Sequence, residues 1–243
     1  MKQAVRRNFD ASVGPYEAYE RRTGRFTALA RLLHAEMAAR ADEPLDTILD
    51  AGAGTGISTR VFAEHTPDTV ALDLSRGMLQ GFDSDARVQG DFDHLPFVDD
   101  AFDAVAFTAS LFIVPDPAVA VQEAARVLQP GGVVGAVAPL GWVHDDGTSV
   151  FDSLDRESRS PAGVDAVASA LDAEFAVETG TWRFATTVAD VQAFHAIPAM
   201  AARLYPTAAP EERVRRVTAL LDGLEGTFEE RWRWMVGVAD EAT

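Results

Sequence analysis

A glycine-rich turn between a predicted strand and a predicted helix is the part of the sequence best suited to bind a ligand. It follows the apolar run Thr47–Asp50 and opens the helical pattern Gly56–Glu64, and its glycines are Gly52, Gly54 and Gly56. Glycine permits a tight turn and a close approach of the backbone to a ligand. The helix that follows directs its N-terminal amides and the positive end of its dipole toward the same place.

The spacing of these glycines disfavours a dinucleotide cofactor. A dinucleotide site has the pattern G-x-G-x-x-G, whose third glycine allows close helix–strand packing beside the pyrophosphate. Here the third glycine comes one residue early, and Ile57 stands where that pattern has glycine. A dinucleotide-dependent oxidoreductase is an alternative, and the spacing of the glycines disfavours it.

The same segment resembles the first motif of the class I S-adenosylmethionine-dependent methyltransferases. Between residues 46 and 138, further segments resemble the family's later motifs in the same order: Asp73, Leu74–Leu79, Gly90–Phe97, Phe102–Val105 and Arg126–Gly132. The most similar branch is the one that methylates small molecules and includes quinone- and biotin-pathway enzymes. The resemblance implies S-adenosylmethionine as the cofactor.

The resemblance also assigns roles to residues. Asp73 corresponds to the acid that binds both ribose hydroxyls, and Asp91 and Phe92 stand at the adenine-contacting positions, although they could simply start a turn and pack in the core. Asp50 would orient the glycine turn and balance the positive charge of the sulfonium. The cofactor-binding residues implied in this way are Asp50, Gly52, Ala53, Gly54, Gly56, Asp73, Leu74, Met78, Asp91, Phe92, Thr108 and, as a tyrosine that closes over the cofactor, Tyr16.

Methyl transfer from a sulfonium is an in-line displacement that alignment and desolvation can accelerate without a catalytic side chain. An oxygen acceptor would need a base, for which His144 and His195 are candidates, although a packed or solvent-exposed histidine is the simpler interpretation of each. The strand ending at Thr108 is followed by Ala109–Phe112, which contains no acid. This departs from the magnesium-dependent catechol-type enzymes, so we expect no metal.

Strands that alternate with helical patterns position these residues. The alternation predicts βαβ units and a parallel sheet covered on both faces. We expect an α/β, Rossmann-like fold with a seven-stranded, mostly parallel sheet flanked by helices, an N-terminal helical lid and an insertion after the fifth strand. The predicted single domain, 1–243, divides into the lid, 1–43, the cofactor-binding core, 44–140, a substrate cover with late sheet elements, 141–226, and a terminal strand, 227–243.

Composition restricts the partners. The net charge of −17 disfavours binding to nucleic acid or to an anionic membrane. The chain has no cysteine and no apolar N-terminal run, so we expect a cytoplasmic protein without disulfides. Its only lysine is Lys2, and lysine loss together with acid excess suggests a halophilic host, whereas a GC-rich genome would also favour arginine over lysine.

We therefore expect methyl transfer to a small-molecule acceptor. Aromatic residues outside the core motifs suggest an apolar to amphipathic acceptor: Phe112, Trp142, Phe151 and Phe194. A protein that kept the fold but serves only for binding or assembly is a further alternative. The sequence leaves the identity of the acceptor and the oligomeric state open.

Overall fold

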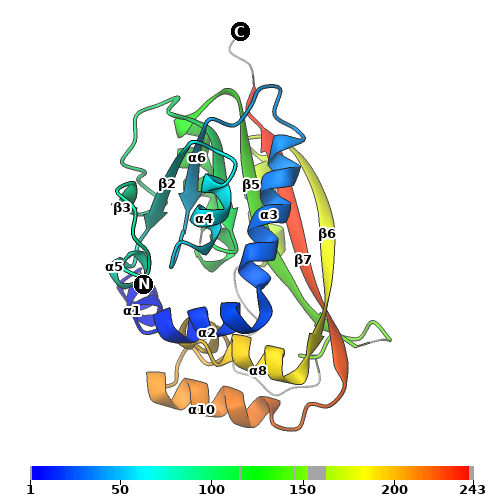
Figure 1. Cartoon of the computed structure of the whole chain (residues 1–243). Helices are drawn as coiled ribbons and strands as arrows, with labels where there is room; N and C mark the ends of the chain where they lie inside the picture. The colour runs from blue at the N-terminus through cyan, green and yellow to red at the C-terminus, as the bar shows by residue number, and fades with distance from the viewer. Residues whose placement is uncertain (1, 115, 145, 153–162, 241–243) are drawn as a thin grey trace. The chain divides into compact units, whose positions relative to one another are not determined.

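The computed structural model describes residues 2–114, 116–144, 146–152 and 163–240 (Figure 1). Within them, strands form a seven-stranded sheet in the order β3-β2-β1-β4-β5-β7-β6. The strands are β1 Thr47–Ala51, β2 Asp68–Asp73, β3 Arg87–Gln89, β4 Phe102–Thr108, β5 Leu128–Val143, β6 Ala176–Thr187 and β7 Thr227–Val238. This confirms the predicted α/β fold and its seven-stranded sheet.

The strands β1 to β5 pair with one another in parallel: β1 pairs with β2 and β4, β2 with β3, and β4 with β5. The apolar runs of β1 and β4 are buried almost throughout, as is expected of parallel strands covered on both faces. The chain order reverses between β1 and β4. In open α/β sheets such a switch point, at the carboxyl ends of the strands, is where ligands bind.

Helices occupy the connections between the strands. They are α1 Lys2–Asp10, α2 Val13–Thr23, α3 Arg25–Ala38, α4 Ile57–Ala63, α5 Arg76–Leu79, α6 Pro117–Val127, α7 Val164–Asp172, α8 Val188–His195, α9 Pro198–Leu204 and α10 Pro210–Leu221, with a 3-10 turn at Leu111–Ile113. Polar residues cap several of them. Ser75 accepts a hydrogen bond from the Met78 amide at 3.1 Å, and Asp116 accepts one from the Ala118 amide at 3.0 Å.

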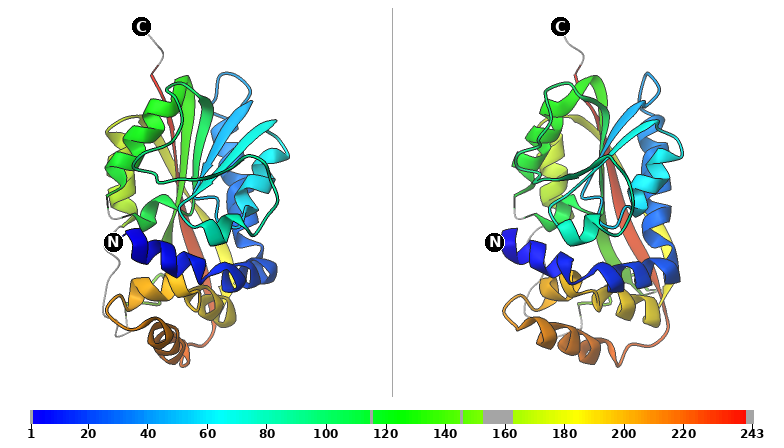
Figure 2. Two further views of the ribbon diagram at one scale, coloured as in Figure 1. Left: turned by 90° about the vertical axis from the view of Figure 1, so that its left-hand side faces the viewer. Right: turned by 60° about the vertical axis from the view of Figure 1, so that its left-hand side comes forward.

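The chain forms two compact units. The core unit comprises Arg25–Pro139, Ala162–Thr181 and Arg233–Thr243, and the helical unit comprises Met1–Gly24, Leu140–Pro161 and Trp182–Trp232. In the core unit, α3 and α4 cover one face of the strands, and α6 and α7 cover the other (Figure 2).

The helix α3 belongs to the core unit, although its residues stand within the predicted lid, 1–43. Its residues Leu33 and Met37 are fully buried and lie directly above Gly135 of β5, where an added Cβ would be 2.4 Å from the Met37 sulfur. The boundary between the helical unit and the core unit therefore follows Gly24, whose left-handed conformation ends α2. That residues 1–24 act as a lid stays a prediction, as do the other predicted domain boundaries.

Three elements differ from what the sequence predicts. The apolar run Val133–Ala138 predicts a strand, but β5 already begins at Leu128. The strand β3 and the helix α7 lie in regions with no predicted element. The insertion predicted after the fifth strand begins with the polar stretch 141–163, which lies partly outside the described residues, at 145 and 153–162. Its described part begins with the end of β5 and a turn in which the Gly147 amide donates to the His144 carbonyl at 2.9 Å.

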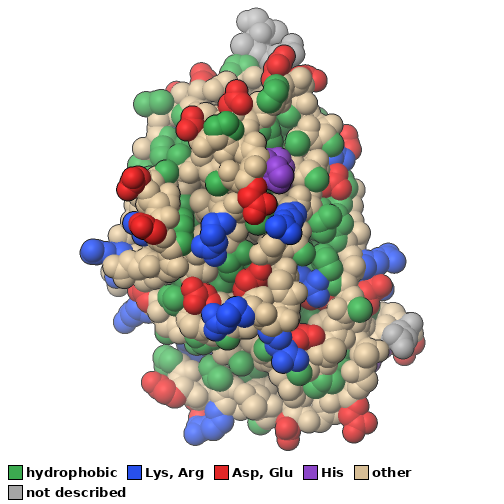
Figure 3. Space-filling model, viewed as in Figure 1, with side chains coloured by type: hydrophobic (Ala, Val, Ile, Leu, Met, Phe, Trp, Pro, Cys, Tyr) green, Lys and Arg blue, Asp and Glu red, His purple; other side chains and the backbone are tan. Residues whose placement is uncertain are grey.

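Acidic and arginine side chains are interspersed on the face shown in Figure 3. Some form close pairs, such as Arg40 with Glu36 at 2.7 Å. Because Asp and Glu exceed Lys and Arg by 38 to 21, pairing cannot neutralise the acidic excess. No helix among the described residues is long and apolar enough to cross a bilayer.

Candidate cofactor site at the carboxyl ends of the strands

The glycine turn connects the carboxyl end of β1 to α4 and is tied to the neighbouring strand. The amides of Gly52 and Ala53 both donate to the Leu72 carbonyl of β2, at 2.8 and 3.0 Å. Gly52 has φ +87° and its added Cβ would lie 2.4 Å from that of Ser110, so both backbone and packing require glycine. Gly54 has φ +57°, but nothing lies within 4 Å of its added Cβ. The turn is therefore closed at Gly52 and open at Gly54.

Asp50 lies behind this turn and is fully buried. One carboxylate oxygen, Oδ2, accepts hydrogen bonds from the hydroxyls of Ser58 at 2.7 Å and Thr59 at 2.6 Å, both at the start of α4. The other, Oδ1, has no hydrogen-bond partner in the described part of the chain. Burial raises the pKa of Asp50 to about 6, against the hydrogen bonds from Thr59 and Ser58, which lower it, and with a smaller contribution from the charge of Asp73.

Asp73 joins two segments of the candidate site. It is the last residue of β2, and its Oδ2 accepts a hydrogen bond from the Gly54 amide at 2.9 Å. Its Oδ1 accepts one from the Ser75 amide at 2.7 Å. The side chain thus lies beside the open part of the glycine turn.

Four further predicted residues lie on the segments around this turn. Phe92 packs edge-on against Phe107 of β4, with ring centroids 5.5 Å apart, and its ring tip is 3.1 Å from the Cβ that Gly52 lacks. Asp91 begins a turn in which its Oδ1 accepts a hydrogen bond from the Asp93 amide at 3.2 Å. Met78 is buried in α5, and the preceding Leu74 is partly buried.

Buried polar atoms without partners gather around the same turn. In addition to Asp50 Oδ1, the hydroxyls of Thr55 and Thr108 are buried and have no hydrogen-bond partner among the described residues. Thr108 ends β4, and Ala109 after it has φ +57°, which is unusual for a residue other than glycine. Such atoms are uncommon in folded proteins and often mark a functional site. Sequence reasoning missed Thr55, although it stands inside the motif.

Ser110 is a second residue that sequence reasoning missed. Its hydroxyl donates to the Ala51 carbonyl at 2.6 Å and so holds the segment after β4 against the end of β1. A lone serine after a strand carries no signal in the sequence that would single it out. Among the described residues there is no group of three or more metal-binding side chains, and the expectation of no metal stays a prediction.

The remaining candidates belong to the helical unit. His195 is buried among aromatic rings, with centroids 4.6 Å from Trp142 and 4.7 Å from Phe151, and Phe194 packs on Trp142 at 5.2 Å. The predicted cover residues of this unit therefore do come together around one histidine. Phe112 instead belongs to the core unit, where it is buried.

The two histidine candidates differ in their surroundings. The Nδ1 atom of His195 is 2.8 Å from the Val191 carbonyl, which can only accept, so Nδ1 carries a hydrogen. His144 is half-buried in a turn, with its ring 5.1 Å from that of Phe228. Tyr16, on α2, is partly buried.

Comparison with known proteins agrees with this geometry. Residues 49–135 match the family model described as a methyltransferase domain. Over 98 residues the chain is 47% identical to malonyl-[acyl-carrier protein] O-methyltransferase of Dechloromonas aromatica, covering 39% of this chain and 36% of that protein. Over 91 residues it is 45% identical to demethylmenaquinone methyltransferase of Mycobacterium marinum, covering 37% of this chain and 39% of that protein.

These matches span less than half the length of the curated relatives. Among solved structures, the YcgJ protein of Bacillus subtilis has a TM-score of 0.60 at 18% identity, over 86% of this chain and 98% of that one, which shows a shared fold. The matched segment contains the glycine turn, Asp73 and the strands on both sides of the switch point. The chain is therefore similar to methyltransferases over residues 49–135, the part of the fold that holds the glycine turn and the switch point.

Proposed function

We propose that this protein transfers a methyl group from S-adenosylmethionine to a small-molecule acceptor by in-line displacement. The observation that carries the proposal is the position of Asp73, whose carboxylate lies at the end of β2 and accepts a hydrogen bond from the Gly54 amide. It thereby combines an acceptor for ribose hydroxyls with a turn that is open toward a ligand at Gly54. When bound, the cofactor would supply an electrophilic methyl group on a sulfonium.

The residues of the core unit would bind and orient this cofactor. Asp73 would accept hydrogen bonds from the ribose, and Asp91 and Phe92 would contact the adenine. Asp50 contributes a buried carboxylate whose charged form a nearby cation would favour. The hydroxyls of Thr55 and Thr108 could donate or accept hydrogen bonds without first giving up a partner among the described residues. This set of groups fits a ligand that carries both hydroxyls and a positive charge.

The acceptor would be apolar to amphipathic. The aromatic cluster of Trp142, Phe151 and Phe194 supports this, because such rings bind apolar bodies while His195 adds one polar group. In a neutral imidazole with its hydrogen on Nδ1, the Nε2 atom is the acceptor, which is the form that a general base requires. We therefore favour His195 over His144 as the base for an oxygen acceptor.

Calorimetric titration tests the proposal. We expect the protein to bind S-adenosylmethionine and S-adenosylhomocysteine and to bind NAD negligibly. Asp73→Ala should weaken binding of S-adenosylhomocysteine at least about tenfold, because hydrogen bonds to a charged group contribute roughly 1.5–3 kcal/mol each. The control is Asp68→Ala, which removes an exposed acid at the opposite end of the same strand and should leave the affinity unchanged.

Thermal melts of both variants establish that they are folded. Because Asp73 also holds two backbone amides, Asp73→Asn provides a milder change that keeps one carbonyl acceptor. Binding of NAD without any response to S-adenosylhomocysteine would refute the proposed cofactor. Unchanged affinity in a folded Asp73→Ala variant would show that the ribose lies elsewhere.

A further inference from the structure

The loop that joins β3 to β4 begins against the candidate site. The Gly90 amide donates to the Asp73 carbonyl at 3.1 Å, which fixes the start of the loop at the end of β2. Asp91 and Phe92 follow, and the His94 amide donates back to the Asp91 carbonyl at 3.1 Å. The position of Asp91 and Phe92 therefore depends on how the far end of this short turn is held.

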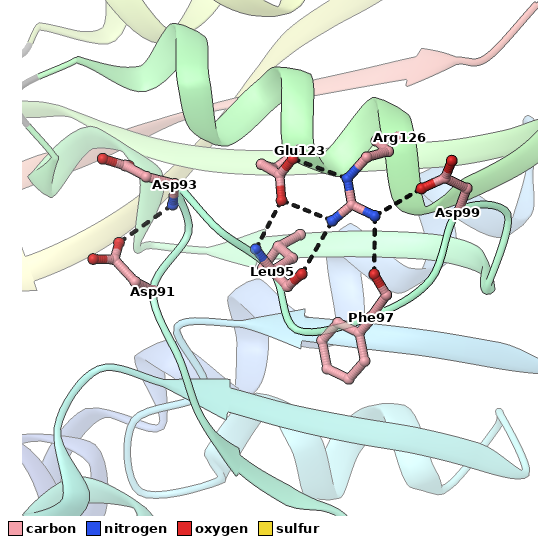
Figure 4. Close-up of polar contacts among 7 residues, drawn as sticks. All are labelled: Asp91, Asp93, Leu95, Phe97, Asp99, Glu123 and Arg126. Carbon is pink, nitrogen blue, oxygen red and sulfur yellow. Dashed lines mark hydrogen bonds and ion pairs between the residues drawn. The ribbon is translucent and has the colours of Figure 1, made fainter.

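Arg126 of α6 holds that far end. All five of its N–H groups donate hydrogen bonds between 2.7 and 3.0 Å (Figure 4). Two reach the backbone carbonyls of Leu95 and Phe97, and one reaches the Asp99 carboxylate. The remaining two go to the two carboxylate oxygens of Glu123, three residues earlier on the same helix.

Glu123 completes the attachment by accepting as well from the Leu95 amide, at 2.8 Å. Both backbone polar groups of Leu95 are thus bound to α6, one by each member of the pair. The hydrogen bonds from Arg126 lower the pKa of Glu123, and those to Glu123 and Asp99 raise the pKa of Arg126. Both shifts favour the charged forms of the two side chains, and their hydrogen bonds orient them toward the loop.

The geometry suggests more than stabilisation. The two side chains are 32% and 21% exposed, and ion pairs this close to solvent contribute little to the free energy of unfolding. A planar guanidinium with every donor used does, however, fix the direction of each partner. The partners here lie on the loop whose Phe92 packs against Phe107 and beside Gly52.

We propose that Arg126 and Glu123 are positioning residues that hold the 91–97 loop on α6 and thereby place Asp91 and Phe92 to recognise the base of the cofactor. This inference rests on the proposed function, in which the base is adenine. It gives the pair a role that can be measured separately from stability. Loosening the loop should weaken recognition of the adenine amino group in particular. A loss of stability alone would lower the affinity for every ligand alike.

The test compares two ligands in calorimetric titrations: S-adenosylhomocysteine and its analogue with purine in place of adenine, which lacks the 6-amino group. We expect wild type to prefer the adenine ligand. Arg126→Met should lower the affinity for the adenine ligand about tenfold and that for the purine ligand much less, so the preference is largely lost. Arg126→Lys keeps the charge without the fork of donors and should restore part of the preference.

The control is Arg40→Met. Arg40 also lies in the core unit and donates to two acids, Glu36 and Glu178, each at 2.7 Å, but it contacts no residue of the loop. Arg40→Met should leave the preference for the adenine ligand over the purine ligand unchanged. In the ligand-free protein, the Leu95 amide should exchange its hydrogen faster in Arg126→Met than in wild type, because its bond to Glu123 depends on the pair.

The outcomes separate the two proposals. A wild-type protein that does not bind S-adenosylhomocysteine would overturn the proposed function and, with it, the role in adenine recognition. If wild type binds and Arg126→Met keeps the full preference for adenine, the positioning role alone is wrong. An equal loss of affinity for both ligands would show that the pair is only structural. Unchanged exchange at Leu95 would show that the pair does not hold the loop. Should Arg126→Met fail to fold, Arg126→Lys and Glu123→Gln provide the same comparison.

Discussion

Replacing Asp50 with asparagine should change how the stability of this protein depends on pH. Asp50 is fully buried, and its burial raises its pKa to about 6 from the ordinary value of 3.8. Between these two values the folded protein binds a proton that the unfolded chain does not. The contribution of Asp50 to the free energy of unfolding therefore falls as the pH rises through this window, and the full cost of the buried charge is present above about pH 6.

The size of the effect follows from the two pKa values. Their difference corresponds to about 3 kcal/mol, at 1.36 kcal/mol for each pH unit. About 1.4 kcal/mol of this is expressed between pH 7.5 and pH 5, where the folded protein becomes mostly protonated at Asp50 and the unfolded chain does not. Asparagine has the same shape and does not titrate, so Asp50→Asn should lack this contribution.

Urea denaturation of both proteins from pH 5 to pH 7.5 measures the effect. The quantity of interest is the free energy of unfolding of wild type minus that of Asp50→Asn, because titration of all other groups largely cancels in this difference. It should increase by about 1.4 kcal/mol as the pH falls from 7.5 to 5. A difference that stays constant over this range, or that decreases toward pH 5, would refute the reasoning that burial dominates at Asp50.

Two further predictions concern the glycine turn and the surface charge. Gly54→Ala should lower the free energy of unfolding by only about 1 kcal/mol, which is the cost of the left-handed backbone. Gly52→Ala should lower it by about 2 kcal/mol more, because its Cβ would lie 2.4 Å from that of Ser110. Equal losses in urea denaturation would contradict this. If the acidic excess reflects a halophilic host, the melting temperature should rise steeply up to molar KCl, whereas ordinary screening is nearly complete by about 0.2 M. A melting temperature that is flat above that concentration would leave base composition of the genome as the explanation of the missing lysines.

Much of the sheet could be predicted because buried parallel strands have a clear signal in the sequence. The apolar run Phe102–Thr108 matches β4, and the run ending at Asp73 matches β2 within one residue. The strand β3, Arg87–Gln89, was missed because it has only three residues and a single apolar one. Short edge strands with polar side chains are not distinguishable from loops by periodicity.

The start of β5 shows how a correct local signal can give a wrong boundary. The segment Gln129–Gly132 has the composition of a turn, and Gly131 indeed has φ +77°. It nevertheless lies within the strand, because the pairing with β4 shifts between Phe102 and Ala104: Leu128 pairs with the first and Val133 with the second. Residues 129–132 of β5 thus stand opposite the single residue Asp103 of β4. Sequence composition alone does not separate such an irregularity within a strand from a turn that ends an element.

The residues proposed to bind the cofactor could be predicted better from the sequence than those proposed to bind the acceptor. Residues proposed for the cofactor stand at fixed positions relative to strand ends, so the motif order predicts their proximity, as Asp73 and Gly54 show. The aromatic residues around His195 come from segments far apart in the chain, and no spacing rule predicted their contact. The Glu123–Arg126 pair was also missed, since its partners are backbone carbonyls, which no sequence pattern displays.

The proposed site of the core unit contains groups whose burial costs stability. A carboxylate buried at Asp50 disfavours folding near neutral pH, and the hydroxyls of Thr55 and Thr108 are buried without partners among the described residues. Elsewhere in the same unit, polar side chains do have partners: Arg126 donates to both carboxylate oxygens of Glu123, and Glu123 also accepts from the Leu95 amide. Buried polar atoms without hydrogen-bond partners, in a unit whose other polar side chains have them, indicate a preformed ligand site rather than a loosely packed region. A cofactor with hydroxyls and a positive charge would compensate these costs, which is why the proposed function and the stability of the free protein are linked through the same three residues.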